Sequence, residues 1–139
     1  MDYRLEVVTL PVSDVDVALA FYTSLGFALD VDYHPRDGFR VVQLTPPGSA
    51  CSIQFGDGLT EAVPGSARAN YLVVDDLEAA RDQLVALGIK VGEIRHKDPV
   101  ETWSGGFAPG LDPERRPYAS LAELTDPDGN SWTLQEIKR

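Results

Sequence analysis

Val12-Ser13-Asp14-Val15 and Val74-Asp75-Asp76-Leu77 open two versions of one stretch of sequence, and each version closes on a Leu-Gly pair. Asp14 and Asp76 are 62 positions apart, and the closing glycines, Gly26 and Gly88, are also 62 positions apart. Equal spacing without a gap is typical of an internal repeat. The sequence therefore predicts a fold built from two copies of one unit.

Each copy reads as a strand, a helix and three further strands. Ser13 or Asp14 is expected to cap the first helix and Asp75 or Asp76 the second, because short polar side chains accept the free N–H groups of a first turn. Glycine then ends each helix. Strands are expected over 5–12, 27–33, 39–45 and 50–55 in the first copy, with a turn over 34–38, and over 67–74, 89–95, 119–125 and 131–137 in the second.

The chain length, 139 residues, fits one compact domain, expected as a first module over 3–56, a linker over 57–66 and a second module over 67–138. The net charge of −10 argues against nucleic-acid binding, which needs a basic surface, and favours cationic ligands. No apolar run is long enough to span a membrane, and the charged N-terminus does not read as a signal peptide. Cys51, the single cysteine, excludes a disulfide framework. We expect a cytoplasmic protein.

A long loop is expected between residues 96 and 118, and loops of this length inside a compact domain are usually functional or disordered. Trp103 and Phe107 flank a Ser-Gly-Gly stretch within it. Aromatic side chains on such a loop can stack on a ligand or pack the loop onto the sheet. Arg115 and Arg116 could pair with an anionic group, although arginines in loops usually stay in water.

With Phe21-Tyr22, the two Leu-Gly pairs and the turn Asp126-Pro127-Asp128-Gly129-Asn130 in place, the chain resembles the vicinal oxygen chelate superfamily of glyoxalases, bleomycin-resistance proteins and extradiol dioxygenases. The resemblance covers nearly the whole chain. It implies an α+β fold in which two βαβββ modules form a cupped mixed sheet around a small-molecule cavity. It also implies a homodimer, as in many members.

The metalloenzymes of this superfamily hold a divalent metal with four side chains from the first and last strands of each module. Carried over by position, these ligands fall on Val7, Gln54, Ala69 and Thr133. Valine and alanine have no lone pair, and an amide and a hydroxyl are weak neutral donors for such metals. We therefore expect no metal and no other cofactor, which puts the glyoxalase and dioxygenase activities in doubt.

The same four positions are expected to face the cavity, together with neighbours two residues along each strand. We expect a small, mostly neutral ligand-binding surface, which suits a flat or polar organic molecule. A solvated concavity without a ligand is the plain alternative. The predicted ligand-binding residues are Val7, Ser52, Gln54, Ala69, Tyr71, Trp103, Phe107 and Thr133.

Catalytic candidates are sparse. Glu123, just before the Asp-Pro-Asp-Gly turn, is the best single candidate for a general base. The plain alternative is that Glu123 is an ordinary exposed residue of a strand. His34 and His96 are again 62 apart and could form an acid–base or metal pair, but isolated turn histidines are usually solvated.

The leading hypothesis is a metal-independent protein of the bleomycin-resistance type, which sequesters a drug-like or secondary-metabolite ligand with cationic or aromatic character. An enzyme of the same superfamily, a lyase, isomerase or dioxygenase with an atypical metal site or a carboxylate base, is the alternative. A regulatory module that binds no small ligand is the third hypothesis.

Overall fold

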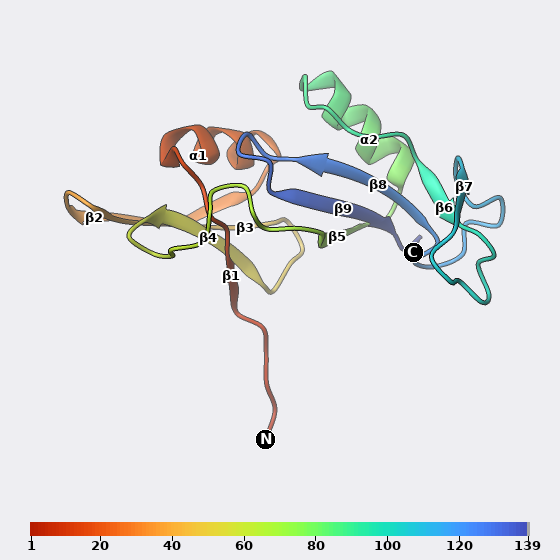
Figure 1. The fold of residues 1–139 in the computed structure, drawn as a ribbon, viewed down its shortest axis with the longest axis horizontal. Coiled ribbons are helices and arrows are strands. Elements are labelled where there is room, and N and C mark those ends of the chain that lie inside the picture. Colours follow the sequence, from red (N-terminus) through yellow and green to blue (C-terminus); the bar gives the residue numbers. More distant parts are fainter. Residues whose placement is uncertain (139) are drawn as a thin grey trace. The chain divides into compact units, whose positions relative to one another are not determined.

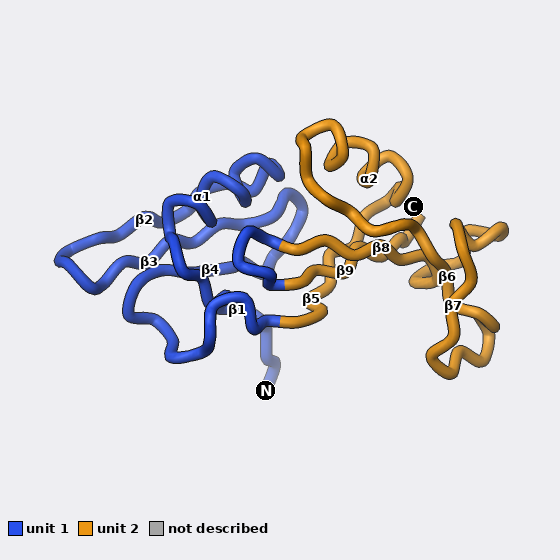
Figure 2. Tube along the Cα trace, turned by 45° about the horizontal axis from the view of Figure 1, so that its top comes forward, with its two compact units in different colours: residues 1–67, 126–130 blue, residues 68–125, 131–139 orange. Residues whose placement is uncertain are grey.

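The computed structural model describes residues 1–138, and the chain divides into two compact units (Figure 2). Unit 1 comprises residues 1–67 and the turn 126–130, and unit 2 comprises residues 68–125 and the chain from Ser131 onward. Each unit has one helix and one mixed sheet (Figure 1). The predicted α+β fold of two βαβββ-like modules is confirmed.

The sheet of unit 1 has the order β1-β4-β3-β2, with β1 parallel to β4 and the other pairs antiparallel. Helix α1 packs against one face of this sheet. The core of the unit consists of apolar side chains from the helix and from alternate positions of the two central strands, β3 and β4. The elements are β1 (Val7–Thr9), α1 (Val15–Ser24), β2 (Ala28–Arg36), β3 (Phe39–Thr45) and β4 (Ser52–Asp57).

Unit 2 repeats this plan and adds one strand. Its sheet has the order β5-β9-β8-β6-β7, with β5 parallel to β9, and helix α2 packs against β8 and β9. The elements are β5 (Asn70–Val74), α2 (Leu77–Ala86), β6 (Arg95–Lys97), β7 (Phe107–Pro109), β8 (Ser120–Thr125) and β9 (Ser131–Glu136). The added strand is β7, since β6 is the counterpart of β2 and β8 is the counterpart of β3.

The helices begin where the repeat predicts. Asp14 is the N-cap of α1 and accepts a hydrogen bond from Val17 N at 3.1 Å. Asp76 is the N-cap of α2 and accepts one from Ala79 N at 3.0 Å. At each helix start the structure therefore selects the second of the two predicted residues, Asp14 over Ser13 and Asp76 over Asp75, and the two N-caps are 62 residues apart.

Several strand predictions are wrong at their ends. The predicted turn 34–38 is shorter, because β2 runs to Arg36 and the hairpin turns at Asp37 and Gly38, where Gly38 has a φ of 83°. Pro35 is tolerated inside β2 because this is an edge strand, where a missing N–H breaks no ladder. Strand β1 is confined to Val7–Thr9, and Figure 1 shows residues 1–6 leading away from it.

The strand predicted over 89–95 is also wrong. Val91 makes one isolated bridge to Leu124, and β6 begins only at Arg95. Arg81 of α2 explains the interruption, since its guanidinium donates to the carbonyls of Gly92 at 2.9 Å and Val91 at 3.3 Å. Those carbonyls are therefore bound by a side chain instead of a neighbouring strand.

The loop predicted between 96 and 118 is partly a hairpin, since β6 and β7 pair antiparallel across it. Among residues 1–138, no helix is both long and apolar enough to cross a membrane.

Candidate ligand-binding site

The open face of the unit 1 sheet carries three of the predicted binding residues. Val7 of β1 lies opposite Ser52 of β4, and Gln54 lies two residues further along β4, so all three point away from α1. Gln54 Nε2 donates to Thr9 Oγ1 at 2.9 Å, and the hydroxyls of Ser52 and Thr45 are 2.7 Å apart. The structure brings these residues together on one face, where Ser52 is buried and Val7 and Gln54 are partly exposed.

The open face of unit 2 carries a second row of predicted residues. Tyr71 of β5 lies opposite Thr133 of β9, which lies opposite Glu123 of β8. Thr133 is buried, Tyr71 has 56% of its surface exposed, and Glu123 is exposed. Glu123 therefore shares a face with the ligand-binding candidates, which its position before the turn did not by itself predict.

Ala69 lies just outside this row. The strand expected from residue 67 begins at Asn70, because Ala69 has a φ of 54° and its N–H donates to Ser131 Oγ at 2.8 Å. A residue in the left-handed region cannot continue the pleat of a strand. Ala69 thus contributes backbone at the end of the face instead of a strand side chain.

The strand register supports the transfer of positions between the two modules. Gln54 lies opposite Thr9, and Thr133 lies opposite Tyr71, while Thr9 and Tyr71 are themselves 62 residues apart. Gln54 and Thr133 are therefore structurally equivalent positions in the two units. These are two of the four positions to which the resemblance carries the metal ligands of the superfamily's metalloenzymes.

The residues at those four positions do not fit a divalent metal. They supply one amide and one hydroxyl, since Val7 and Ala69 have hydrocarbon side chains. Asn70, which a one-residue slip would offer instead, lies opposite the buried Trp132 and so points to the helix side of the sheet. Among residues 1–138, no three His, Cys, Asp or Glu side chains are grouped so as to hold a metal ion.

Trp103 and Phe107 lie together at the other edge of the unit 2 sheet. Their ring centroids are 5.5 Å apart, and Trp103 Nε1 donates to the carbonyl of Gly106 at 2.7 Å. β5 and β7 are separated by four strand steps of about 4.8 Å, or about 19 Å, so this pair is well apart from Tyr71. The predicted residues of unit 2 therefore form two groups.

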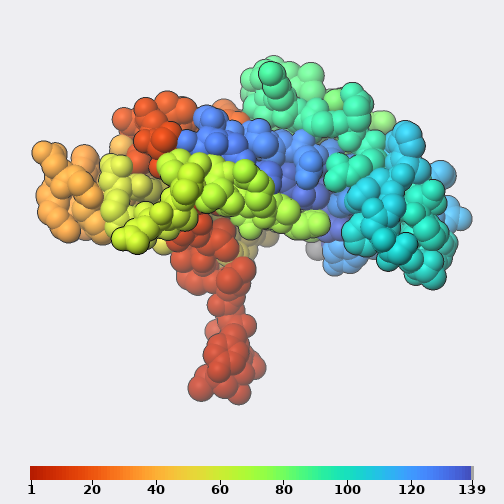
Figure 3. Space-filling model, in the orientation of Figure 1, coloured from red at the N-terminus to blue at the C-terminus, as the bar shows by residue number. Residues whose placement is uncertain are grey.

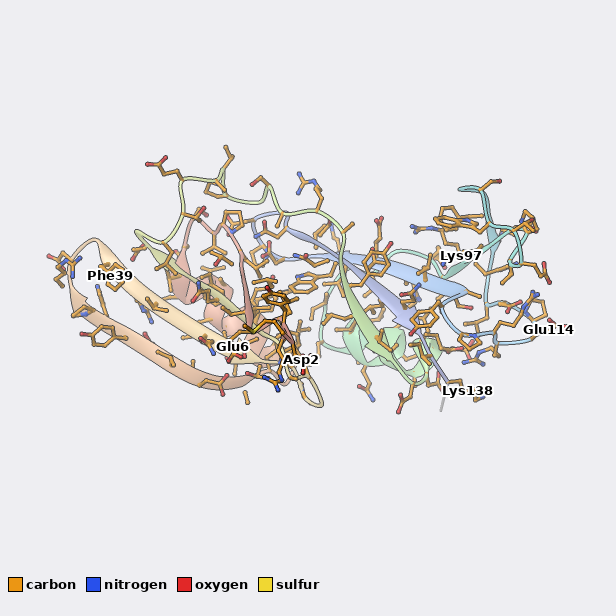
Figure 4. The ribbon with its side chains drawn as sticks, turned by 90° about the horizontal axis from the view of Figure 1, so that it is seen from below. Asp2, Glu6, Phe39, Lys97, Glu114 and Lys138 are labelled. Atoms are coloured by element: carbon orange, nitrogen blue, oxygen red, sulfur yellow. The ribbon has the colours of Figure 1, made fainter. Side chains whose placement is uncertain are left out.

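Two cations accompany the aromatic pair, and sequence reasoning missed both. Arg95 lies 4.5 Å from the ring centroid of Phe107, and Lys97 lies 4.8 Å from that of Trp103. Figure 4 labels Lys97 in this part of unit 2. The order Arg95-His96-Lys97 in a strand could have predicted them, because alternate residues of a strand point to the same face and the two cations are two residues apart.

Arg115 and Arg116 bind carboxylates of unit 2. Arg115 makes a two-point contact with the buried Glu136, at 2.7 and 2.6 Å, and Glu136 also accepts the N–H of Leu77 at 2.9 Å. Arg116 holds the buried Asp112 in the same way, at 2.9 Å for both contacts. The hydrogen bonds from the two guanidiniums hold the pKa of Glu136 and the pKa of Asp112 below their usual ranges. Arg115 thus binds the loop to β9 and to the start of α2, whereas Arg116 links residues within the loop.

The remaining candidates lie apart from these groups. His34 is exposed in β2, and His96 Nδ1 is 2.8 Å from the carbonyl oxygen of Gly110. Cys51 precedes β4 and is partly exposed. A hollow of about 430 Å³ lies on the helix side of unit 2, between α2 and the segments 93–94 and 109–111, and it contains none of the predicted residues.

Comparison with known proteins agrees with the fold. TnmS3, an antibiotic binding protein from Streptomyces sp. CB03234, is 28% identical, with a TM-score of 0.74 over 99% of this chain and 98% of that one. A glyoxalase/bleomycin resistance protein from the same strain is 28% identical, with a TM-score of 0.70 over 96% of this chain and 100% of that one. A superfamily member from Sphaerobacter thermophilus DSM 20745 is 25% identical, with a TM-score of 0.73 over 98% of each chain.

None of the curated protein sequences matches the chain. The sequence profile of the glyoxalase/bleomycin resistance protein/dioxygenase superfamily matches residues 4–134, which is nearly the whole chain. With the repeated module and the mixed sheets, this match establishes the family: the chain belongs to the glyoxalase/bleomycin resistance protein/dioxygenase superfamily.

Proposed function

We propose that this protein is a metal-independent small-molecule-binding protein, which sequesters a drug-like or secondary-metabolite ligand in the cytoplasm. The observation that carries the proposal is the donor set at the four family metal positions, two hydrocarbon side chains, one amide and one hydroxyl. Such a set suits hydrogen bonding to an organic molecule better than it suits a divalent metal.

The open sheet faces support this proposal. On unit 1, the partly exposed amide of Gln54 lies beside Val7, with the buried hydroxyl of Ser52 next to them, and on unit 2 the exposed ring of Tyr71 adjoins Thr133. A few polar groups within apolar and aromatic surroundings are typical of drug-sized ligand sites. The similarity to TnmS3, an antibiotic binding protein, points in the same direction.

Two further properties belong to the proposal. Both modules, 3–56 and 67–138, act as one domain, and the protein is a homodimer. The second property is supported by the edge strand β2, where Leu29, Val31 and Tyr33 have 51, 40 and 58% of their surfaces exposed. An apolar edge of this kind is usually covered by a partner or protected from aggregation.

Thermal shifts with a panel of bleomycin-like and aromatic polyketide antibiotics test the proposal on chelator-treated protein. A ligand present at about 100 times its dissociation constant stabilises the folded state by about 2.7 kcal/mol, which is readily detected. Tyr71→Ala should weaken the shift of a compound that binds at this row. Leu87→Ala, at an exposed position beyond α2, should leave the shift unchanged. The absence of any shift at saturating concentrations would contradict the proposal.

A second candidate function is catalysis by a carboxylate base, and one observation favours it. Glu123 lies directly opposite Thr133 on the open face and is exposed there, within reach of whatever that face binds. A lyase or isomerase step needs a base in such a position. If a compound bound by the protein is also converted, Glu123→Gln should abolish conversion while binding persists, and unchanged turnover would eliminate this candidate.

A further inference from the structure

The two modules differ most where β6 is followed by β7. In unit 1 the corresponding strand β2 returns to β3 through the two-residue turn Asp37-Gly38. In unit 2 the chain from Lys97 to Ser120 forms a long excursion that contains Trp103 and β7. Insertions in one copy of a repeat lie on its loops and often serve binding. This insertion is visible at the surface in Figure 3, where residues near 100 are coloured teal and cyan.

The insertion extends the open face of the sheet. Arg95 lies opposite Leu121 of β8 and Pro109 of β7, while Lys97 lies opposite Phe107. Because side chains of paired residues point to the same side of a sheet, Arg95, Lys97, Phe107 and Leu121 share the face of Gln135 and Thr133. Trp103 and Phe107 keep 43 and 42% of their surfaces exposed, so both rings remain accessible.

The two cations on this face have no acidic partner among residues 1–138. Every ion pair described for the chain involves Arg40, Arg81, Arg115 or Arg116, and Arg95 and Lys97 contact aromatic rings instead. Glu101 of the same insertion binds Arg116 and so has its charge compensated. In a chain with a net charge of −10, this edge of the sheet thus presents two cations that make no ion pair within residues 1–138.

The segment that carries the rings is held in place. Asp98 N donates to the carbonyl of Gly106 at 3.0 Å, and the indole of Trp103 donates to the same carbonyl. A side chain at position 106 would clash, since a Cβ there would be 2.7 Å from the carbonyl oxygen of Asp98. Rings fixed by the backbone lose little freedom when they bind a flat ligand.

From these observations we propose that the β6–β7 edge of unit 2 is a subsite for an aromatic ligand with an anionic substituent. Trp103 and Phe107 stack on the ring system, and Arg95 and Lys97 bind its carboxylate. A charge-assisted contact between guanidinium and carboxylate is stronger than an exposed cation–π contact, so the cations gain by turning to the ligand. The subsite rests on the proposed binding function and narrows it to one ligand class.

The test compares two probes that differ only in charge, 2-naphthoate and 2-naphthamide. Each is titrated into the ¹⁵N-labelled full chain, and the indole N–H signal of Trp103, assigned with Trp103→Phe, reports binding. We expect 2-naphthoate to bind about tenfold more tightly than 2-naphthamide, because only the former forms charge-assisted contacts. The double variant Arg95→Gln/Lys97→Gln should bring the two affinities within about twofold of each other while 2-naphthamide binding persists.

Arg36→Gln is the matched control. Arg36 lies 4.9 Å from the ring centroid of Phe39 at the β2–β3 hairpin, so it is also a cation over an aromatic ring but lies outside the subsite. It should leave the tenfold preference intact. A far-UV circular dichroism spectrum like that of the original chain establishes that each variant is folded.

Other outcomes overturn the subsite. Equal affinities of the two probes would refute the role of the cations. A Trp103 signal that ignores both probes but shifts with protein concentration would assign this edge to a second copy of the chain. In either case a thermal shift with the antibiotic panel would leave the proposed binding function standing. If neither naphthyl probe bound and no antibiotic gave a thermal shift, the subsite and the binding function would both be refuted.

Discussion

Tyr22 shows at the scale of one residue how a family motif contributes to the fold. Its ring is fully buried between those of Phe27 and Phe55, and its hydroxyl donates to Asp126 Oδ2 at 2.8 Å. Asp126 also accepts the backbone N–H groups of Asp128 and Asn130 at 2.9 and 3.0 Å. The Phe-Tyr and Asp-Pro-Asp-Gly-Asn motifs, more than 100 residues apart, thus meet in one buried network.

Tyr22→Phe should lower the free energy of unfolding by about 1–2 kcal/mol, because it removes a donor from a buried carboxylate and leaves the ring packing intact. Urea unfolding measures the change. Tyr3→Phe is the matched control, since that side chain is 91% exposed and should cost nothing measurable. A Tyr22→Phe variant as stable as the original chain would show that the hydroxyl contact contributes little.

Glu136 links three parts of unit 2 and makes stability depend on pH. Arg115 lowers the pKa of Glu136 in the folded state, so the ionised form stabilises the fold above the ordinary value of 4.5. This contribution is lost as the pH falls below 4.5 towards the folded-state pKa. Glu136→Gln should cost about 2 kcal/mol at pH 7, less than a fully buried pair, because the Arg115 side chain stays 25% exposed.

Urea unfolding of Glu136→Gln and the original chain at pH 7 and pH 3 tests this account. The loss of stability on acidification should be smaller in the variant, since the group that takes up the proton is gone. Equal losses in the two proteins would show that Glu136 does not contribute to the acid sensitivity.

At the scale of elements, the helices could be predicted most closely. Asp14 and Asp76 cap them as the repeat predicts, because capping depends on a local contact between neighbouring residues. The late start of β6 could not be predicted, since the Arg81 side chain reaches from α2 to the carbonyls of the two residues Val91 and Gly92 that precede it. The aromatic residues of the site could be found from the sequence, but their separation from Tyr71 follows only from the sheet order.

The capping role is tested on α2, where the neighbouring aspartate serves as a control. Asp76→Ala should lower the free energy of unfolding by about 1 kcal/mol, because Ala79 N loses its acceptor. Asp75→Ala should change it by less than about 0.5 kcal/mol, as expected for an exposed position away from such contacts. Chemical denaturation distinguishes the two, and equal effects would contradict the assignment of the cap.

At the scale of the whole molecule, the exposed edge strand β2 predicts self-association. Light scattering coupled to gel filtration should give a mass near 30 kDa, twice the 15.1 kDa of one chain. Val31→Lys should shift the mass towards that of the monomer, because a charged side chain on an exposed edge discourages strand pairing. A monomeric original chain at micromolar concentration would contradict the proposed homodimer.

Native mass spectrometry of chelator-treated protein, incubated with the panel of bleomycin-like and aromatic polyketide antibiotics, tests the central claim most directly. The Val, Gln, Ala and Thr side chains at the family metal positions predict an antibiotic adduct that forms without any divalent metal. Adducts that appear only after zinc, nickel or iron is restored, with one metal ion per chain, would contradict metal-independent binding.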